Sequence, residues 1–438
     1  MMEAPVVNVG IMTEKAVSFV FDGEYVHTET GNFLTGEQRV LYVNGNIVYN
    51  GKLYKELFFE PVSPHCSFEL KAVTIGIRFH WERQEDLRFK GALNLVIDKE
   101  GIVFINQVDA EEYLSSVISS EMSAYASKEL LKAHAVISRS WLLSQVEKNF
   151  QQPAAPPRYR NNYRDKEESI RWYDREDHQI FDVCADDHCQ RYQGITRTST
   201  PIVQEAVLET RGEILTDGHS ICDARYSKCC GGVTELFENC WEPVPHPYLA
   251  ALRDSKEDTL PDLTNEEEAG KWIATAPEAF CNTRDKTILS QILNRYDQET
   301  SDFYRWRLTY SQKELAGLIR RKSGIDFGEI LKLTPLERGT SGRIVRLKIV
   351  GTHQTFTIGK ELEIRRTLSE SHLYSSAFIV EKEDIRFGIP QRFTLRGAGW
   401  GHGVGLCQIG AAVMSTQGYD YRAILNHYFP GTGIEKRY

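Results

Sequence analysis

Short runs of alternating apolar and polar residues dominate the first quarter of the chain. Examples are "VSFVF", "RVLYVN" and "VTIGIRF", and Gly, Asn and Asp residues separate the runs. Alternation with a period of two places apolar side chains on one face of a strand, and the separating residues favour turns. The pattern predicts a strand-rich region over residues 1 to about 107.

The pattern changes to a helical period at Asp109. This residue can cap a helix, Glu112 stands three positions later as in a capping box, and apolar residues then recur on one face up to Met122. A second helix is predicted from about residue 127 to 146. The turn between the two helices places Glu121 at the end of the first helix.

The rest of the chain mixes both patterns and ends in a glycine-rich loop followed by two helices. We expect an α+β fold with a strand-rich core, a helical pair that carries Glu121, and a helical insertion. The predicted parts are a strand-rich N-terminal region (1–90), a first core part (91–254) with a metal-binding segment (178–189), a charged helical insertion or subdomain (255–335), and a second core part (336–438).

Composition and charge narrow the choice of partners. The 438 residues are enough for two or three domains, and 41% of them are hydrophobic. The net charge is -9 and no block of Lys or Arg is present, so we expect no nucleic-acid partner and a neutral or polar substrate. No apolar run approaches the length of a membrane span, so no membrane segment is expected.

The N-terminal residues "MMEAPVVNVGIMTEK" lack a basic stretch followed by an apolar one. Taken as it stands, this beginning predicts a cytoplasmic protein, whereas a chain that has lost an export signal would belong to the cell envelope. The nine cysteines are an odd number and cluster in the middle of the chain. This distribution favours reduced thiols and a metal over a disulfide framework.

Four metal-binding side chains fall within twelve residues: His178, Cys184, His188 and Cys189. Two thiolates and two imidazoles are a donor set that tetrahedral Zn²⁺ prefers. Four protein ligands leave no open position for water, so the predicted zinc is structural. Two alternatives stay open: the cysteines are small buried apolar residues, or one histidine points away and the zinc becomes hydrolytic.

Glu121 is the candidate catalytic residue. The negative end of a helix dipole and apolar neighbours both disfavour the ionised carboxylate. An acid kept protonated near neutral pH can donate a proton to a leaving group. The alternative is an ordinary solvated residue at a helix end.

Two further motifs carry polar residues that can contact a ligand. The first is "RYSKCCGG", with Tyr226, Ser227 and Lys228, and the second is "RGAGWGHGVGLCQIG", with His402 and Gln408. The glycines match no phosphate-binding pattern and allow close approach of the backbone. His402 can equally cap the final helices, and a nucleophilic pair of His402 with one of the vicinal cysteines is a weaker alternative.

Four segments, in this order, resemble the SpoIID/LytB family: "VDAEEYLSSVISSEMSAYASKELLKAHAVISRSWLL", "CDARYSKCCGGVTELFENCW", "RGTSGRIVRLKIVG" and "WGHGVGLCQIGAAVMSTQGYDYRAILNHYF". The resemblance spans about residues 90–438. It places the family's catalytic glutamate on Glu121, and the histidine and cysteine cluster of zinc-binding relatives on the four residues named above. The sequence departs from the family at Lys228-Cys229-Cys230, where relatives often carry Ser or Thr.

The resemblance implies a peptidoglycan lytic transglycosylase. Such an enzyme cleaves the MurNAc-GlcNAc bond of glycan strands or muropeptides and leaves a 1,6-anhydro end, with Glu121 as the sole general acid and base. It implies that Tyr226, Ser227, Lys228, His402 and Gln408 hold the glycan. Two alternatives remain: a non-catalytic glycan-binding activator of a cell-wall amidase, and a zinc hydrolase.

Overall fold

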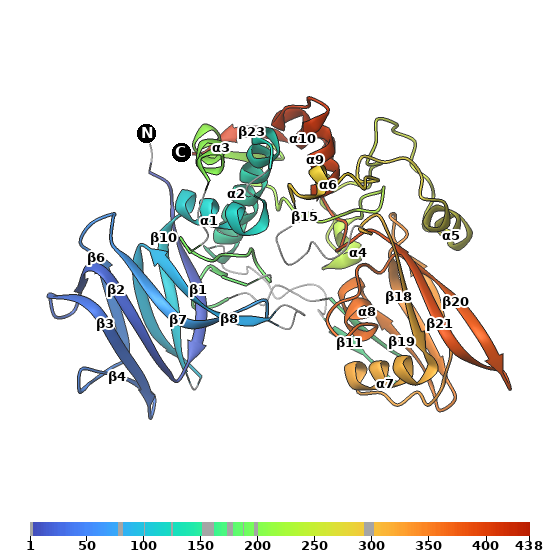
Figure 1. Cartoon of the computed structure of the whole chain (residues 1–438), viewed down its shortest axis with the longest axis horizontal. Coiled ribbons are helices and arrows are strands. Elements are labelled where there is room, and N and C mark those ends of the chain that lie inside the picture. The colour runs from blue at the N-terminus through green and yellow to red at the C-terminus, as the bar shows by residue number, and fades with distance from the viewer. Residues whose placement is uncertain are drawn as a thin grey trace.

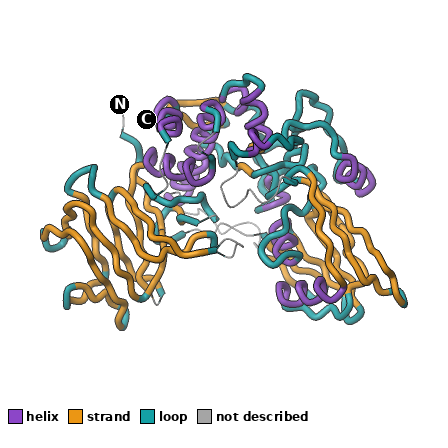
Figure 2. The backbone as a smooth tube through the Cα atoms, in the orientation of Figure 1, coloured by secondary structure: helices purple, strands orange, loops and turns teal. Residues whose placement is uncertain are grey.

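The computed structural model describes residues 3–77, 82–99, 101–123, 126–150, 162–172, 178–186, 188–196, 200–292 and 302–438. These residues form a strand-rich α+β fold, as predicted. Sheets lie at both ends of the molecule, and most of the helices lie between and above them (Figures 1 and 2).

The N-terminal sheet contains eleven strands of the described chain. Its strands alternate buried and exposed residues, as in β2, where Val17, Phe19 and Phe21 are buried, and their side chains form one apolar core. The strands are β1 (Val6–Glu14), β2 (Ala16–His27), β3 (Asn32–Val43), β4 (Asn46–Tyr49), β5 (Lys52–Tyr54), β6 (Glu56–Pro61), β7 (Ser67–Ile75), β8 (Arg83–Lys90), β9 (Ala92–Asp98), β10 (Gly101–Asp109) and β13 (Val183–Cys184).

The boundary expected at residue 90 falls inside this sheet. Strand β9 pairs with β6 and β10, and β10 pairs with β1, all antiparallel. The family motifs begin near residue 90, but the strands on either side of that point share one core. Strand β13, from the segment with the predicted metal ligands, joins the edge of the sheet parallel to β1.

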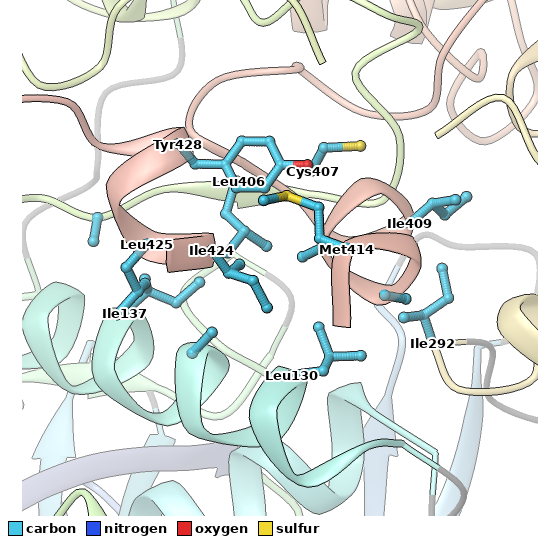
Figure 3. Close-up of a cluster of buried hydrophobic side chains, with 14 of the residues drawn as sticks. Leu130, Ile137, Ile292, Leu406, Cys407, Ile409, Met414, Ile424, Leu425 and Tyr428 are labelled. Atoms are coloured by element: carbon cyan, nitrogen blue, oxygen red, sulfur yellow. The ribbon is translucent and has the colours of Figure 1, made fainter. Parts of the chain in front are cut away.

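A helical layer follows the sheet. Asp109 caps α1 as predicted, since its carboxylate accepts hydrogen bonds from the N–H groups of Glu111 (2.8 Å) and Glu112 (3.4 Å). Helix α2 packs against α9 and α10 in a central apolar cluster (Figure 3). The helices of this layer are α1 (Ala110–Glu121), α2 (Lys128–Phe150), α3 (Pro201–Glu209), α9 (Gln408–Thr416) and α10 (Tyr421–Tyr428). Two short strand pairs join it: β14 (Glu213–Thr216) with β23 (Gly433–Lys436), and β15 (Tyr226–Ser227) with β22 (Leu406–Cys407).

Two smaller sheets with a shared core form the other end of the molecule. One contains β11 (Asn162–Arg164), β12 (Glu168–Arg171), β17 (Ile330–Arg338), β18 (Ile344–Gly351) and β19 (Thr355–Gly359). The other contains β16 (Arg305–Ser311), β20 (Phe378–Arg386) and β21 (Ile389–Ala398). The remaining helices are α4 (Phe237–Cys240), α5 (Glu266–Thr275), α6 (Lys286–Leu289), α7 (Gln312–Ser323) and α8 (Glu361–Thr367).

The region expected as a helical insertion is only partly helical. Residues 255–335 contain α5, α6 and α7, but also β16 and the start of β17. The run "RWRLTYS" alternates with a period of two and pairs with β21 along its whole length. This region is therefore continuous with the C-terminal sheets. Among the described residues, no helix combines the length and apolar character that a membrane span requires.

Candidate functional site

Glu121 is the last residue of α1 and is partly exposed. Its Oε1 atom accepts a hydrogen bond from the backbone N–H of Arg191 at 3.3 Å. Arg191 belongs to the segment that carries the predicted metal ligands. The carboxylate therefore faces a segment 70 residues further along the chain and keeps a path to solvent.

The turn after Glu121 is held from the region around α6. Gln291 follows α6 and is buried. Its backbone oxygen accepts a hydrogen bond from the N–H of Ser123, and its side-chain Oε1 accepts one from the N–H of Ser127, both at 3.0 Å. This role could not be predicted from the sequence, because a lone Gln in a charged stretch has no motif around it.

A second set of contacts reaches the same turn from α9 and α2. The amide nitrogen of Gln408 lies 3.8 Å from the sulfur of Met122, the residue after Glu121, and 3.2 Å from Nε2 of His134. Nδ1 of His134 lies 3.1 Å from the hydroxyl of Ser138, one helical turn further along α2. These buried groups connect α1, α2 and α9 directly behind the glutamate.

His134 is a neutral part of this arrangement. Burial, followed by the nearby charge of Lys228, lowers the pKa of His134 to about 3. Because the amide nitrogen of Gln408 donates, Nε2 of His134 accepts, and Nδ1 carries the proton that it donates to Ser138. His134 therefore orients Gln408 and does not titrate near neutral pH. This role of His134 was not predicted from the sequence, where its only signal is the spacing of four between His134 and Ser138 on one helix.

The residues expected to hold a glycan differ in exposure. Tyr226 packs edge-on against the ring of His134, with ring centroids 4.6 Å apart. The ammonium group of Lys228 donates to the backbone oxygen of Ile292 at 3.1 Å. Tyr226 and Lys228 are partly exposed, whereas Ser227 and Gln408 are buried. Of these residues, Tyr226 and Lys228 are therefore accessible from solvent, whereas Gln408 contacts its buried neighbours.

His402 has a different environment. Its ring packs edge-on against Trp241 at 4.8 Å, and its Nδ1 accepts a hydrogen bond from the N–H of Val404 at 3.1 Å. Burial, and then the charge of Arg225, lowers the pKa of His402 well below its usual value. These contacts match a neutral residue that shapes the glycine-rich turn.

The structure gives no support to a Cys-His nucleophile. Cys229 and Cys230 are both fully buried, and burial raises the pKa of both thiols well above the usual range. A nucleophilic cysteine needs an accessible thiolate.

The four predicted metal ligands converge. One donor atom from each of His178, Cys184, His188 and Cys189 lies within 4.8 Å of the others. The sulfur of Cys189 is 3.5 Å from Nε2 of His178 and 3.5 Å from Nδ1 of His188, and the sulfur of Cys184 is 3.8 Å from the same Nδ1 atom. A tetrahedral zinc site with ordinary bond lengths has N···S edges of about 3.6 Å. The donor set and its spacing therefore fit one zinc ion.

The segment with these ligands is joined to the N-terminal sheet. The N–H of Asn8 donates to the carboxylate of Asp182 at 2.8 Å, and the N–H of Ala185 donates to the oxygen of Gly10 at 2.9 Å. Only glycine fits at position 10, because a Cβ atom there would lie 2.5 Å from the ring of Phe181. The ligands are therefore anchored on one side to β1.

The other side of this segment contacts α1 and α2. The hydroxyl of Tyr113 donates to the side chain of Gln190 at 3.4 Å, and the N–H of Gln193 donates to the hydroxyl of Ser116 at 3.2 Å. These residues flank Arg191, whose N–H meets Glu121. A metal at the four ligands would thus fix the donor that orients the glutamate.

A second group of donors has no counterpart in the sequence motifs. One donor atom from each of Cys230, Asp254, Cys281 and Cys407 lies within 4.8 Å of the others, and all four residues are buried. The four positions span 178 residues, so no local spacing announces them. All nine cysteines lie in the described ranges and none forms a disulfide, in agreement with the expected reduced thiols.

Two family profiles match the chain. The profile described as Stage II sporulation protein (SpoIID) matches residues 98–216, which include α1, Glu121 and the four ligands of the first donor group. A domain of unknown function (DUF8618) matches residues 235–405.

Three curated relatives illustrate the similarity. The amidase enhancer of Bacillus subtilis is 24% identical over 332 residues, which cover 73% of this chain and 40% of that protein. Stage II sporulation protein D of Bacillus amyloliquefaciens is 24% identical over 332 residues, 76% of each chain. An uncharacterized protein of Brachyspira hyodysenteriae is 24% identical over 348 residues, 80% of this chain and 72% of the other.

Fold, site and relatives together define a class of α+β protein with a helical pair beside a histidine and cysteine cluster. Residues 98–216 match the SpoIID family, and most of the chain is similar to stage II sporulation protein D.

Proposed function

We propose that this protein is a lytic transglycosylase of peptidoglycan in which Glu121 is the general acid and base. Similarity to the SpoIID family and to an amidase enhancer supports a cell-wall-related role. The observation that carries the finer proposal is the position of Glu121: partly exposed, at a helix end, with one oxygen on the N–H of Arg191.

The reaction needs only one carboxyl group. Protonated Glu121 gives its proton to the glycosidic oxygen between MurNAc and GlcNAc as the bond from that oxygen to the anomeric carbon breaks. The C6 hydroxyl of the same MurNAc attacks the anomeric carbon, and its proton passes to the carboxylate of Glu121. The product is a 1,6-anhydro ring, water is not consumed, and the glutamate returns protonated. Hydrolytic glycosidases, in contrast, generally use two carboxyl groups.

The residues around Glu121 have supporting roles in this proposal. A hydrogen bond from the N–H of Arg191 stabilises the carboxylate that forms after proton donation and fixes its direction. Tyr226 and Lys228 supply an aromatic face and a cation for a polar glycan strand. Gln408 and His134 hold the turn after α1.

The proposed cofactor is one structural Zn²⁺, bound by His178, Cys184, His188 and Cys189. Four protein ligands complete a tetrahedral shell, so the ion supplies rigidity and no reactive water. The neighbouring thiol of Cys189, and then burial, raise the pKa of Cys184 to about 11. A cation between the two sulfurs offsets this effect and allows both to bind as thiolates.

The variant Glu121→Gln tests the proposal. We expect it to fold normally and to lower the rate of formation of 1,6-anhydro ends by about a hundredfold to ten-thousandfold, because the amide can neither donate nor accept the proton. Digests of purified sacculi, with and without stem peptides, are analysed by mass spectrometry.

The matched control is Glu112→Gln, on an exposed position of the same helix. It should release product at the wild-type rate. Wild-type amounts of 1,6-anhydro ends from the Glu121 variant would exclude Glu121 as the acid.

A relative named amidase enhancer favours a second candidate function, a non-catalytic activator of a cell-wall amidase. The chain spans 40% of the length of that relative. This function predicts that the wild-type protein binds glycan strands without forming 1,6-anhydro ends and raises the rate of an added amidase. The same sacculus digests, repeated with an amidase present, separate the two functions.

A further inference from the structure

A group of buried thiols lies apart from the Glu121 carboxylate and from the first donor group. Cys229 and Cys230 follow β15, Cys281 lies between α5 and α6, and Cys407 ends β22, so the chain brings three distant segments together. Each of these thiols is at most 1% exposed, and Asp254 beside them is fully buried.

The distances within the group match the shell of a single ion. The sulfur atoms of Cys230 and Cys281 are 3.6 Å apart, too far for a disulfide. Tetrahedral zinc with Zn–S bonds of about 2.3 Å has S···S edges of about 3.8 Å. With Cys407 and Asp254, the donor atoms all lie within 4.8 Å of one another.

Asp254 is a buried carboxylate whose position suits binding of a cation. One of its oxygens accepts from the hydroxyl of Tyr428 at 2.6 Å, and the other accepts from the N–H of Cys281 at 2.9 Å. Buried carboxylates are normally paired with a cation or coordinate a metal.

The surroundings of the sulfur atoms resemble the outer shell of a metal–thiolate site. The N–H of Cys230 points to the sulfur of Cys407 at 3.2 Å, and the N–H of Gly232 points to the sulfur of Cys230 at 3.4 Å. The buried guanidinium of Arg343 donates to the backbone oxygen of Cys230 at 3.0 Å, which brings a positive charge close to the group. Such N–H groups and charges stabilise thiolates bound to a metal.

We propose that Cys230, Asp254, Cys281 and Cys407 bind a second zinc ion. Three thiolates and one carboxylate complete a tetrahedral shell with no open position, so this ion is structural. It connects the loop after β15, the region between α5 and α6, and the start of α9. Gln408 follows Cys407 directly and contacts the turn after Glu121, so the ion fixes the element from which Gln408 reaches that turn.

The zinc content of the purified protein tests this proposal and requires no activity assay. We expect two zinc ions per chain in the wild-type protein, by plasma mass spectrometry after exhaustive dialysis. The double variant Cys184→Ser/Cys189→Ser, which removes the first group, should retain one zinc. Adding Cys281→Ser to it should remove that zinc, whereas adding Cys222→Ser, at another fully buried cysteine, should not.

Cobalt substitution in the Cys184→Ser/Cys189→Ser background identifies the ligands. The remaining site should show sulfur-to-cobalt absorption, which should disappear with the metal when Cys281→Ser is added and should persist in Asp254→Asn. A single zinc in the wild-type protein that disappears with Cys184 and Cys189 would overturn the proposal. A Cys230–Cys281 disulfide in non-reducing peptide maps would do the same. Neither readout depends on the reaction proposed for Glu121.

Discussion

The carboxylate of Glu111 shows how one buried charge fixes the helix that carries Glu121. Glu111 lies in the first turn of α1 and forms two hydrogen bonds with the guanidinium of Arg139, at 2.8 and 2.7 Å. The hydroxyl of Tyr438 adds a third contact at 2.6 Å. Arg139 is fully buried. Its ion pair with Glu111 therefore joins α1 to α2 in the interior, and Tyr438, which follows β23, contacts the same carboxylate.

The variant Glu111→Gln should lower the free energy of unfolding by about 3 to 5 kcal/mol at pH 7, because it leaves the charge of Arg139 buried without a partner. Urea denaturation measures this loss. Glu112→Gln is the control: its carboxylate is 48% exposed and lies 3.3 Å from Lys90, so it should cost no more than about 1 kcal/mol.

The same pair sets a pH dependence. Burial alone would raise the pKa of Glu111, but the hydrogen bonds and charge of Arg139, with smaller contributions from Tyr438 and Gly212, lower it below the usual 4.5. A carboxyl with a lowered pKa in the folded state contributes stability that is complete above the unfolded value and is lost as the pH falls through the folded value.

The stability difference between wild type and Glu111→Gln should therefore be constant above about pH 5 and shrink as the pH falls further below 4.5. Denaturation curves over this range test the sign. A difference that grows in acid would contradict the assignment.

At the scale of elements, the ligand segment (residues 178–186 and 188–193) connects the N-terminal sheet to α1. It meets β1 through Asp182 and Ala185, and α1 through Arg191 and Gln193. It contains little regular structure beyond the two residues of β13. A bound ion would supply the rigidity that such a short strand cannot.

Cys184→Ser or chelation should therefore release this segment. We expect amide hydrogen exchange at Cys189–Gln193 to rise on the order of tenfold or more, with a lower melting temperature, before turnover is affected. Cys66→Ser is the control, because Cys66 precedes β7, is buried in the apolar core of the same sheet and lies outside the donor group. Unchanged exchange with immediate loss of turnover would instead indicate a catalytic metal.

At the scale of the whole molecule, three large apolar clusters divide the chain. One fills the N-terminal sheet, one fills the C-terminal sheets, and the third packs the helices between them. The two sheet clusters lie at opposite ends of the molecule, and we expect each to lose its packing separately from the other.

Unfolding in guanidinium chloride should consequently show more than one transition. Leu95→Ala and Leu395→Ala form a matched pair, since both residues are fully buried, one in each sheet cluster. Each should cost about 2 to 5 kcal/mol and move only the transition of its own sheet. Circular dichroism and tryptophan fluorescence follow the transitions; a single transition that both variants shift equally would show that the sheets unfold together.

The two donor groups are related only in the folded molecule. The first reaches Glu121 through the N–H of Arg191, and the second reaches the following turn through Gln408. If both groups bind zinc, each ion stabilises the surroundings of Glu121 through a different set of contacts.

Local chemistry allowed much of this fold to be predicted. The alternating runs predicted the N-terminal strands, and Asp109 predicted the start of α1, because side-chain period and helix caps depend on neighbours a few residues away. The four residues of the first donor group could be predicted to lie together for the same reason, since they fall within twelve residues. The segment around β16 was misjudged because its alternation was hidden among charged helical stretches.

Consecutive residues were enough to predict the N-terminal strands, the start of α1, the resemblance to SpoIID proteins and the first donor group, because periodicity, caps and closely spaced ligands depend on neighbouring positions. Only the tertiary structure placed His134, Gln291 and Gln408 around the turn after Glu121, and gathered Cys230, Asp254, Cys281 and Cys407 in the core. These groups are brought together by packing between segments far apart in the chain, and such packing leaves no local pattern.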